Sequence, residues 1–137
     1  MPDVTATIKV GFESTAIFTL VSSSPTGRVQ VSNNPAVINL LPSSSAERVF
    51  VLTLAPDTNE HVSSVDGATS DPIGQAESGS PTVVSMGGPG PNEVTLTCTY
   101  PLEGLNPTQP PLTSTVTFTA DDNQEHHDPS IAFNPPE

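Results

Sequence analysis

The chain has 137 residues, enough for one domain with a hydrophobic core and too few for two comfortable ones. Its net charge is −12, and Lys9, Arg28 and Arg48 are its only lysine and arginine residues, which argues against nucleic acid or an anionic membrane as a partner. Only 13% of the residues are charged and 16 are proline, and together with abundant threonine, serine and valine this favours an all-β fold.

Alternation between apolar and polar residues marks the predicted strands. In chain order they lie at 4–12, 16–21, 28–32, 36–41, 49–54, 82–85, 94–100, 115–120 and 130–134. Clusters of proline, glycine, serine and asparagine separate them. About eight or nine short strands with such turns predict an all-β, single-domain Ig-like antiparallel β-sandwich over residues 1–137, with a short C-terminal strand. The paired cysteines and core tryptophan of true Ig domains are absent.

Two of these strands carry information about position within a sheet. Residues 16–21 are apolar on both faces, which favours a central strand. In the tail, Ile131 and Phe133 share one face, but Pro129 precedes them and Pro135 follows. Because proline has no N–H for a ladder, we expect the tail to form an edge or terminal strand.

The segment 55–81 is long and polar, and it lacks a clear strand pattern. It is rich in Asp, Ser and Gly, with Val62, Val65 and Ile73 as its apolar anchors. A loop of this length in a compact domain usually hides short strands, carries function or is mobile.

The C-terminal tail concentrates the reactive side chains. Carboxylates and imidazoles precede an Asp–Pro bond, in the order Asp121, Asp122, Glu125, His126, His127 and then Asp128–Pro129. An aspartyl side chain can attack its own carbonyl carbon through a small ring, because nucleophile and electrophile belong to one residue. Proline nitrogen also leaves more readily than an ordinary amide nitrogen once it is protonated. A fold that holds this geometry and supplies an acid or a base could break the bond.

The hypothesis of self-cleavage gives each of these groups a role. Asp128 is the residue whose own carbonyl is cut, and a neighbouring carboxylate, Asp122 in preference to Asp121, orients or deprotonates a water. His126 or His127 donates a proton to the prolyl nitrogen. Direct attack by Asp128, which gives a cyclic anhydride that water opens, is the alternative route.

The chain ends Asp128-Pro129-Ser130-Ile131-Ala132-Phe133-Asn134-Pro135-Pro136. This ending, with the overall size and strand content, resembles the DP-EP family, small bacterial β-sandwich proteins named for an Asp-Pro followed shortly by a Glu-Pro. The resemblance implies a sandwich that cuts itself between Asp128 and Pro129 and keeps the released peptide bound as a strand. Asn134 stands where the family's name implies a glutamate, so that carboxylate is not carried over.

These inferences define the expected partners. The chain's own peptide 129–137 should stay docked, because Ile131 and Phe133 bury apolar area worth roughly 2 kcal/mol each. A strand held without a covalent link could exchange between copies, so a homo-oligomer is a further expectation. No cofactor and no metal is expected. Met1-Pro2-Asp3 leads into the first strand without a targeting signal, which favours a cytoplasmic protein.

Several of these features also have simpler interpretations. Asp–Pro pairs are ordinary turn formers, and the second one, Asp71–Pro72, is expected to be inert. Adjacent side chains such as His126 and His127 point to opposite faces of an extended segment, so both rarely reach one metal ion. Cys98 lies on the inward face of its strand, which favours a buried structural thiol over a nucleophile.

The alternative function is a non-catalytic binding or structural module with Ig-like architecture. Its exposed threonine-rich faces or the segment 55–81 would contact a protein or a glycan. Aromatic residues make up only 4% of the chain, which weakens carbohydrate binding by stacking.

Overall fold

The computed structural model describes most of the chain in separate stretches. They are residues 3–12, 16–24, 26–32, 36–44, 46–57, 65–70, 81–87, 93–101, 112–120, 124–126 and 130–135. The regular structure within these stretches consists of β-strands alone. In chain order they are β1 (Val4–Phe12), β2 (Ala16–Ser24), β3 (Val29–Ser32), β4 (Val37–Leu40), β5 (Val49–Pro56), β6 (Val65–Ser70), β7 (Thr82–Gly87), β8 (Val94–Thr99), β9 (Leu112–Ala120), β10 (Gln124–His126) and β11 (Ser130–Phe133).

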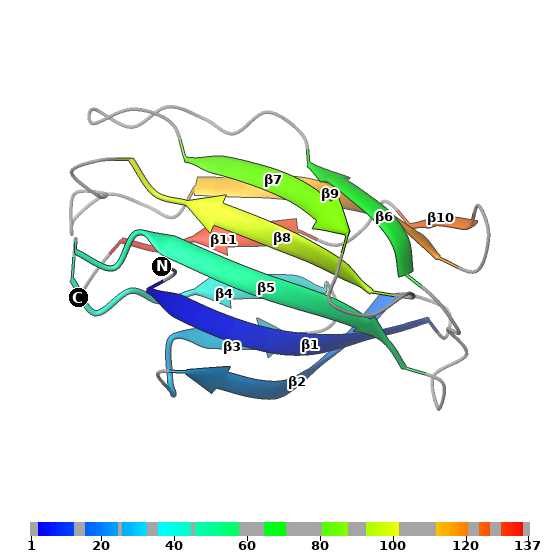
Figure 1. The fold of residues 1–137 in the computed structure, drawn as a ribbon, viewed down its shortest axis with the longest axis horizontal. Coiled ribbons are helices and arrows are strands. Elements are labelled where there is room, and N and C mark those ends of the chain that lie inside the picture. The colour runs from blue at the N-terminus through cyan, green and yellow to red at the C-terminus, as the bar shows by residue number, and fades with distance from the viewer. Residues whose placement is uncertain are drawn as a thin grey trace.

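The strands form two sheets that pack face to face (Figure 1). The first sheet has the order β2-β1-β5-β8-β7. The second has the order β10-β9-β11-β4-β3, and β6 pairs with β9 outside this path. The predicted all-β sandwich is therefore confirmed. Every predicted strand has a counterpart, and the short strands β6 and β10 add to the second sheet; β6 is a strand hidden within segment 55–81.

The alternation seen in the sequence explains the core between the sheets. In β1, β5 and β8 the inward side chains are apolar and the outward ones are mostly threonine. The buried apolar residues of these three strands include Val4, Ile8, Val10, Phe50, Leu52, Leu54, Val94, Leu96 and Cys98. The second sheet contributes Val29, Ile38, Leu40, Val116, Ile131 and Phe133. Burying one large apolar side chain stabilises a fold by about 1.5–3 kcal/mol before entropy costs.

Two strand pairs depart from the predicted antiparallel arrangement. β1 runs parallel to β5, and β11 runs parallel to β4, whereas the other pairs described are antiparallel. Between β1 and β5 the chain passes through β3 and β4 of the opposite sheet, a crossover that allows parallel pairing. Alternation shows which face of a strand is buried, and it carries no information about the direction of the neighbouring strand.

Two expectations about position within the sheets need correction. β2, which was expected to be central, lies at the edge of the first sheet and pairs with β1. β11, which was expected at an edge or as the terminal strand, is the last strand of the chain but lies inside the second sheet, between β9 and β4. Its flanking prolines do not conflict with this position, because the ladder spans Ser130 to Phe133 and includes neither of them.

Candidate functional site

Most of the residues predicted to carry chemistry lie outside the described part of the chain. These are Asp121, Asp122, His127, Asp128 and Pro129. His126 is the last residue of β10, opposite Phe118 of β9. The site is therefore built from the described residues on either side of the Asp–Pro bond, above all from β11.

β11 is held in the second sheet from both sides. Ile131 lies opposite Ile38 of the parallel neighbour β4 and opposite Ser114 of the antiparallel neighbour β9. The Ser130 N–H donates a hydrogen bond to the Ala36 carbonyl oxygen at 3.0 Å, which extends this contact toward the Asp–Pro bond. Residues 130–133 thus occupy a groove whose two walls are the backbones of β4 and β9.

The side chains of β11 are buried on both faces of the sheet. Ile131 and Phe133 are fully buried in the core, and Ala132, on the opposite face, is only 5% exposed. The Phe133 ring meets Tyr100 edge to face, with centroids 5.2 Å apart and ring planes at 73°. Tyr100 also packs against Phe50, at a centroid distance of 5.7 Å. Such aromatic pairs contribute about 0.5–1.5 kcal/mol each beyond their buried area.

A hydrogen-bonded clasp, formed by Tyr100, Asn134 and the Leu40 carbonyl, closes over the end of the tail. The Tyr100 hydroxyl donates to the Asn134 carbonyl oxygen at 2.7 Å. Asn134 donates to the Leu40 carbonyl oxygen from Nδ2 at 3.1 Å and from its backbone N–H at 3.3 Å. Burial, with a smaller contribution from Cys98, raises the pKa of Tyr100, so the hydroxyl keeps its proton and remains a donor. We call this set the Tyr100–Asn134 clasp.

Arg48 fixes the strand end from which Tyr100 projects. Its Nη2 donates to the Tyr100 carbonyl oxygen at 3.2 Å, and its Nε donates to the Pro101 carbonyl oxygen at 3.1 Å. The backbone N–H groups of Val49 and Arg48 donate in turn to the Asp3 carboxylate, each at 3.0 Å, and hold the pKa of Asp3 below its usual value. One of the three lysine and arginine side chains is therefore used to position the clasp.

The strand register changes across the interval that contains the Asp–Pro bond. His126 lies opposite Phe118, and Ser130 lies opposite Thr115. Three residues separate the first members of these pairs in the sequence, whereas two separate their partners on β9. The sequence thus carries one residue more between β10 and β11 than between their partners on β9.

The clasp is the part of the site that the sequence analysis missed. Tyr100 and Asn134 are 34 positions apart, so no local pattern connects them. One signal was available, because Tyr100 is the only tyrosine of the chain and continues the inward face of its strand. A buried tyrosine hydroxyl needs a hydrogen-bond partner, but that partner is a backbone carbonyl here, which no residue type marks in the sequence.

Cys98 is confirmed as a buried residue of the core. Burial raises the pKa of its thiol to about 12, so the group stays neutral at ordinary pH. A neutral, enclosed thiol is a poor nucleophile, which supports the structural interpretation.

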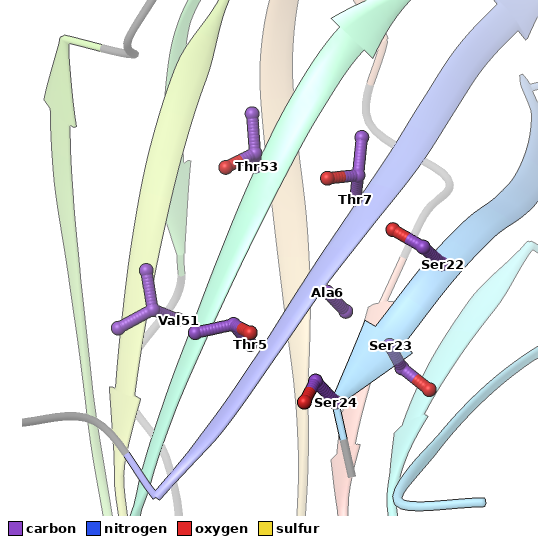
Figure 2. A pocket seen from close by; sticks show the side chains of 8 residues that line it. All are labelled: Thr5, Ala6, Thr7, Ser22, Ser23, Ser24, Val51 and Thr53. Atoms are coloured by element: carbon purple, nitrogen blue, oxygen red, sulfur yellow. The ribbon is translucent and has the colours of Figure 1, made fainter. Parts of the chain in front are cut away.

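A shallow hollow of about 190 Å³ lies on the outer face of the first sheet (Figure 2). Its lining consists of small and mostly hydroxyl-bearing side chains, namely Thr5, Ala6, Thr7, Ser22, Ser23, Ser24, Val51 and Thr53. Thr7 and Thr53 lie side by side on the paired strands β1 and β5. The register of β2 skips Val21 at this point, because Thr7 pairs with Ser22 and Ile8 with Leu20. The described lining contains no acid, base or cation, and hydroxyl groups alone suit weak polar contact rather than catalysis.

The hollow belongs to a larger surface on the same sheet, which we call the hydroxyl face and which Lys9 borders on β1. Strand register aligns its residues in two rows, Ser24–Thr5–Val51–Thr97–Val84 and Ser22–Thr7–Thr53–Thr95–Met86. Val84 and Met86, at the edge strand β7, are 53% and 61% exposed. Neither row contains a charged residue, although the protein has 15 acidic side chains.

Comparison with known proteins adds no identification. No family model matches the chain, and no curated protein matches it. Among the described residues, no three His, Cys, Asp or Glu side chains gather where they could hold a metal ion. A search of the same residues finds no helix that is long and apolar enough to cross a membrane.

Proposed function

We propose that this protein is a β-sandwich that hydrolyses its own Asp128–Pro129 bond once and retains the released segment 129–137 as strand β11. The observation that carries the proposal is the placement of β11 inside the second sheet, fixed on both sides, directly after the Asp–Pro bond. The resemblance of the tail to the DP-EP family is a second, independent support.

The geometry supports the proposal because the bond lies between two anchored segments. On one side, β10 is paired with β9; on the other, β11 is paired with both β9 and β4. In the sequence, the interval between them carries one residue more than the matching part of β9. Ladders that are fixed on both sides can hold a peptide group in a reactive conformation that a free chain rarely adopts.

The proposed reaction is a single hydrolysis. The oxygen of a water molecule adds to the Asp128 carbonyl carbon, and the bond from that carbon to the Pro129 nitrogen breaks. The Asp122 or Asp121 carboxylate takes a proton from the water, and His127 or His126 delivers one to the departing nitrogen. The products are a new carboxyl group on Asp128 and a secondary amine on Pro129. In the alternative route the Asp128 side chain attacks first, and water opens the resulting anhydride.

The released segment stays bound because cleavage removes none of its contacts in the groove. Ile131 and Phe133 remain buried, and their burial is worth roughly 2 kcal/mol each. The two backbone ladders and the Tyr100–Asn134 clasp add hydrogen bonds with net contributions of about 0.5–1.5 kcal/mol each. A cut protein should therefore be indistinguishable from an intact one in shape while it remains folded.

Mass spectrometry of the denatured protein tests the proposal. The unmodified chain should give one fragment that ends at Asp128 and one that begins at Pro129, and Asp128→Ala should give only the intact mass. Asp71→Ala is the matched control, because it removes the chain's other Asp–Pro pair and should leave the fragments unchanged. A single intact mass for the unmodified protein, after long incubation at neutral and mildly acidic pH, would contradict self-cleavage.

The hydroxyl face supports a second candidate function, a non-catalytic binding module with Ig-like architecture. Two rows without charge in a protein of net charge −12 suit a neutral partner, such as a glycan or an uncharged protein surface. Binding to a panel of immobilised neutral glycans and proteins tests this role. Thr53→Lys should abolish binding, whereas Gln30→Lys, on an exposed position of β3, should preserve it. Equal binding by both variants would contradict the use of this face.

A further inference from the structure

We infer that the groove between β4 and β9 is a peptide receptor, and that once the chain is cut ahead of β11 it accepts the tail of a second copy of this protein. The inference rests on the proposed function for the natural cut, but the groove itself is built from described residues of β4, β9 and the Tyr100–Asn134 clasp. It assigns to the protein a ligand, an extended peptide that adds a strand.

The groove recognises backbone along the whole of β11. The strand is hydrogen-bonded to a parallel neighbour and an antiparallel one, so both its edges are matched. An empty groove would expose the edges of β4 and β9 together with the core residues that β11 covers, which is unfavourable in water. A groove that is costly to leave empty binds any chain segment that fits it.

The side chains of β11 define what fits. Ile131 and Phe133 fill the core, and Ala132 is enclosed on the opposite face, where a small residue is required. Asn134 is held at both its carbonyl and its amide by the clasp. The ligand is therefore an extended peptide with the order branched apolar, small, aromatic, asparagine.

The tail of a second copy is the occupant that these requirements select, because it has the same sequence in the same register. While the tail is covalently attached, its effective concentration at its own groove is much higher than the concentration of free tails, so it excludes a competitor. A cut removes this advantage, and tails from different copies then compete on equal terms. Exchange should be slow, because the outgoing strand must break both ladders before the incoming one pairs.

Isotope mixing tests the inference without relying on self-cleavage. A variant with a site-specific protease sequence in place of residues 127–129 is prepared in light and heavy-isotope forms, cut with that protease and mixed. Native mass spectrometry should show light sandwiches carrying heavy tails and heavy sandwiches carrying light tails, and these two mixed species together should rise toward half of all complexes at equal concentrations. The same mixture without protease should show none. If this replacement prevents folding, the sequence is placed at 121–123 instead, in an Asp128→Ala background that blocks self-cleavage, so that only the protease releases 124–137.

The outcomes separate the two proposals. Cut complexes that keep their own tails without mixing, or that lose them entirely, would overturn the receptor while leaving self-cleavage untouched. Mixed complexes from the protease-cut variant, combined with a single intact mass for the unmodified chain, would support the receptor and overturn self-cleavage. Specificity is checked with added peptide 129–137, which should displace the bound tail; the same peptide with Phe133→Ala should not.

Discussion

β2 and β11 are opposite cases of the relation between sequence and position in a sheet. β2 is apolar on both faces yet lies at an edge, with Val21 53% exposed. β11 is flanked by prolines yet lies in the interior, with Ile131 and Phe133 fully buried. Apolar residues on both faces therefore do not place a strand in the interior of a sheet, and proline excludes a ladder hydrogen bond only at its own position. The register of β2 skips Val21, and such an irregularity in an edge strand discourages pairing with other chains.

The largest predicted effect compares one apolar truncation in each strand. In an uncut Asp128→Ala background, Phe133→Ala should lower the free energy of unfolding by about 3–5 kcal/mol, because it leaves a cavity beside Tyr100. Val21→Ala in the same background should change it by less than about 0.5 kcal/mol. Urea denaturation measures both values. Similar losses of unfolding free energy for the two variants would show that β2 and β11 contribute equally to stability.

The second prediction isolates the polar end of β11. Tyr100→Phe keeps the ring against Phe133 and removes the hydroxyl that donates to the Asn134 carbonyl. We expect a loss of about 1–3 kcal/mol, because the acceptor is left without its donor in a partly buried site. Unfolding in the Asp128→Ala background measures the loss. An unchanged midpoint would mean that packing alone holds the tail.

The third prediction compares how acid affects the stability of β3, at an edge of the second sheet, and of β11, in its interior. Near the start of β3, Glu47 accepts hydrogen bonds from Ser43 N–H (2.6 Å), Ser43 Oγ (2.9 Å) and Arg28 Nε (2.9 Å). Burial alone would raise the pKa of Glu47, but the bonds from Ser43 and Arg28 outweigh it and the pKa is lowered. The ionised Glu47 therefore stabilises the folded state fully at pH values above its unfolded-state pKa of about 4.5. This stabilisation is lost as the pH falls through the lowered pKa of the folded state.

Acid should therefore loosen β3 before β11. Glu47→Gln should remove this acid-dependent stability, which we expect to be on the order of 1 kcal/mol for a partly exposed pair, with side chains 28% and 18% exposed. Hydrogen exchange locates the change when it is expressed as protection relative to the intrinsic exchange rate at each pH. Protection should fall in acid in β3 and stay unchanged in β11, whose clasp does not titrate in this range. An acid response of the same size in the Gln variant would assign the effect to another group.

The sequence predicted where the strands lie better than it predicted which strands pair with one another. The alternation of Val94 to Thr99 or Val4 to Phe12 identified strands and their buried faces, because that pattern is local. β6 was not identified as a strand, since Val-Asp-Gly-Ala-Thr-Ser has a single large apolar residue to mark a face. The parallel pairs were also missed, because the identity of a neighbouring strand depends on the path of the whole chain.

The candidate site was predicted in part. The tail was correctly identified as a strand with Ile131 and Phe133 inward, since both residues lie on one face of the sequence pattern. Its interior position and the Tyr100–Asn134 clasp depend on residues distant in the chain, and no local pattern encodes them. The roles assigned to Asp121, Asp122, His126, His127 and Asp128 stay predictions.

The position of β11 also has a consequence for protein synthesis. Translation proceeds from the N-terminus, so the strands on both sides of β11 are made before the segment that joins them. The ribosome must therefore release β11 itself before the second sheet can become continuous. Every nascent or prematurely terminated chain therefore passes through, or stops at, a form in which β4 and β9 have no strand between them.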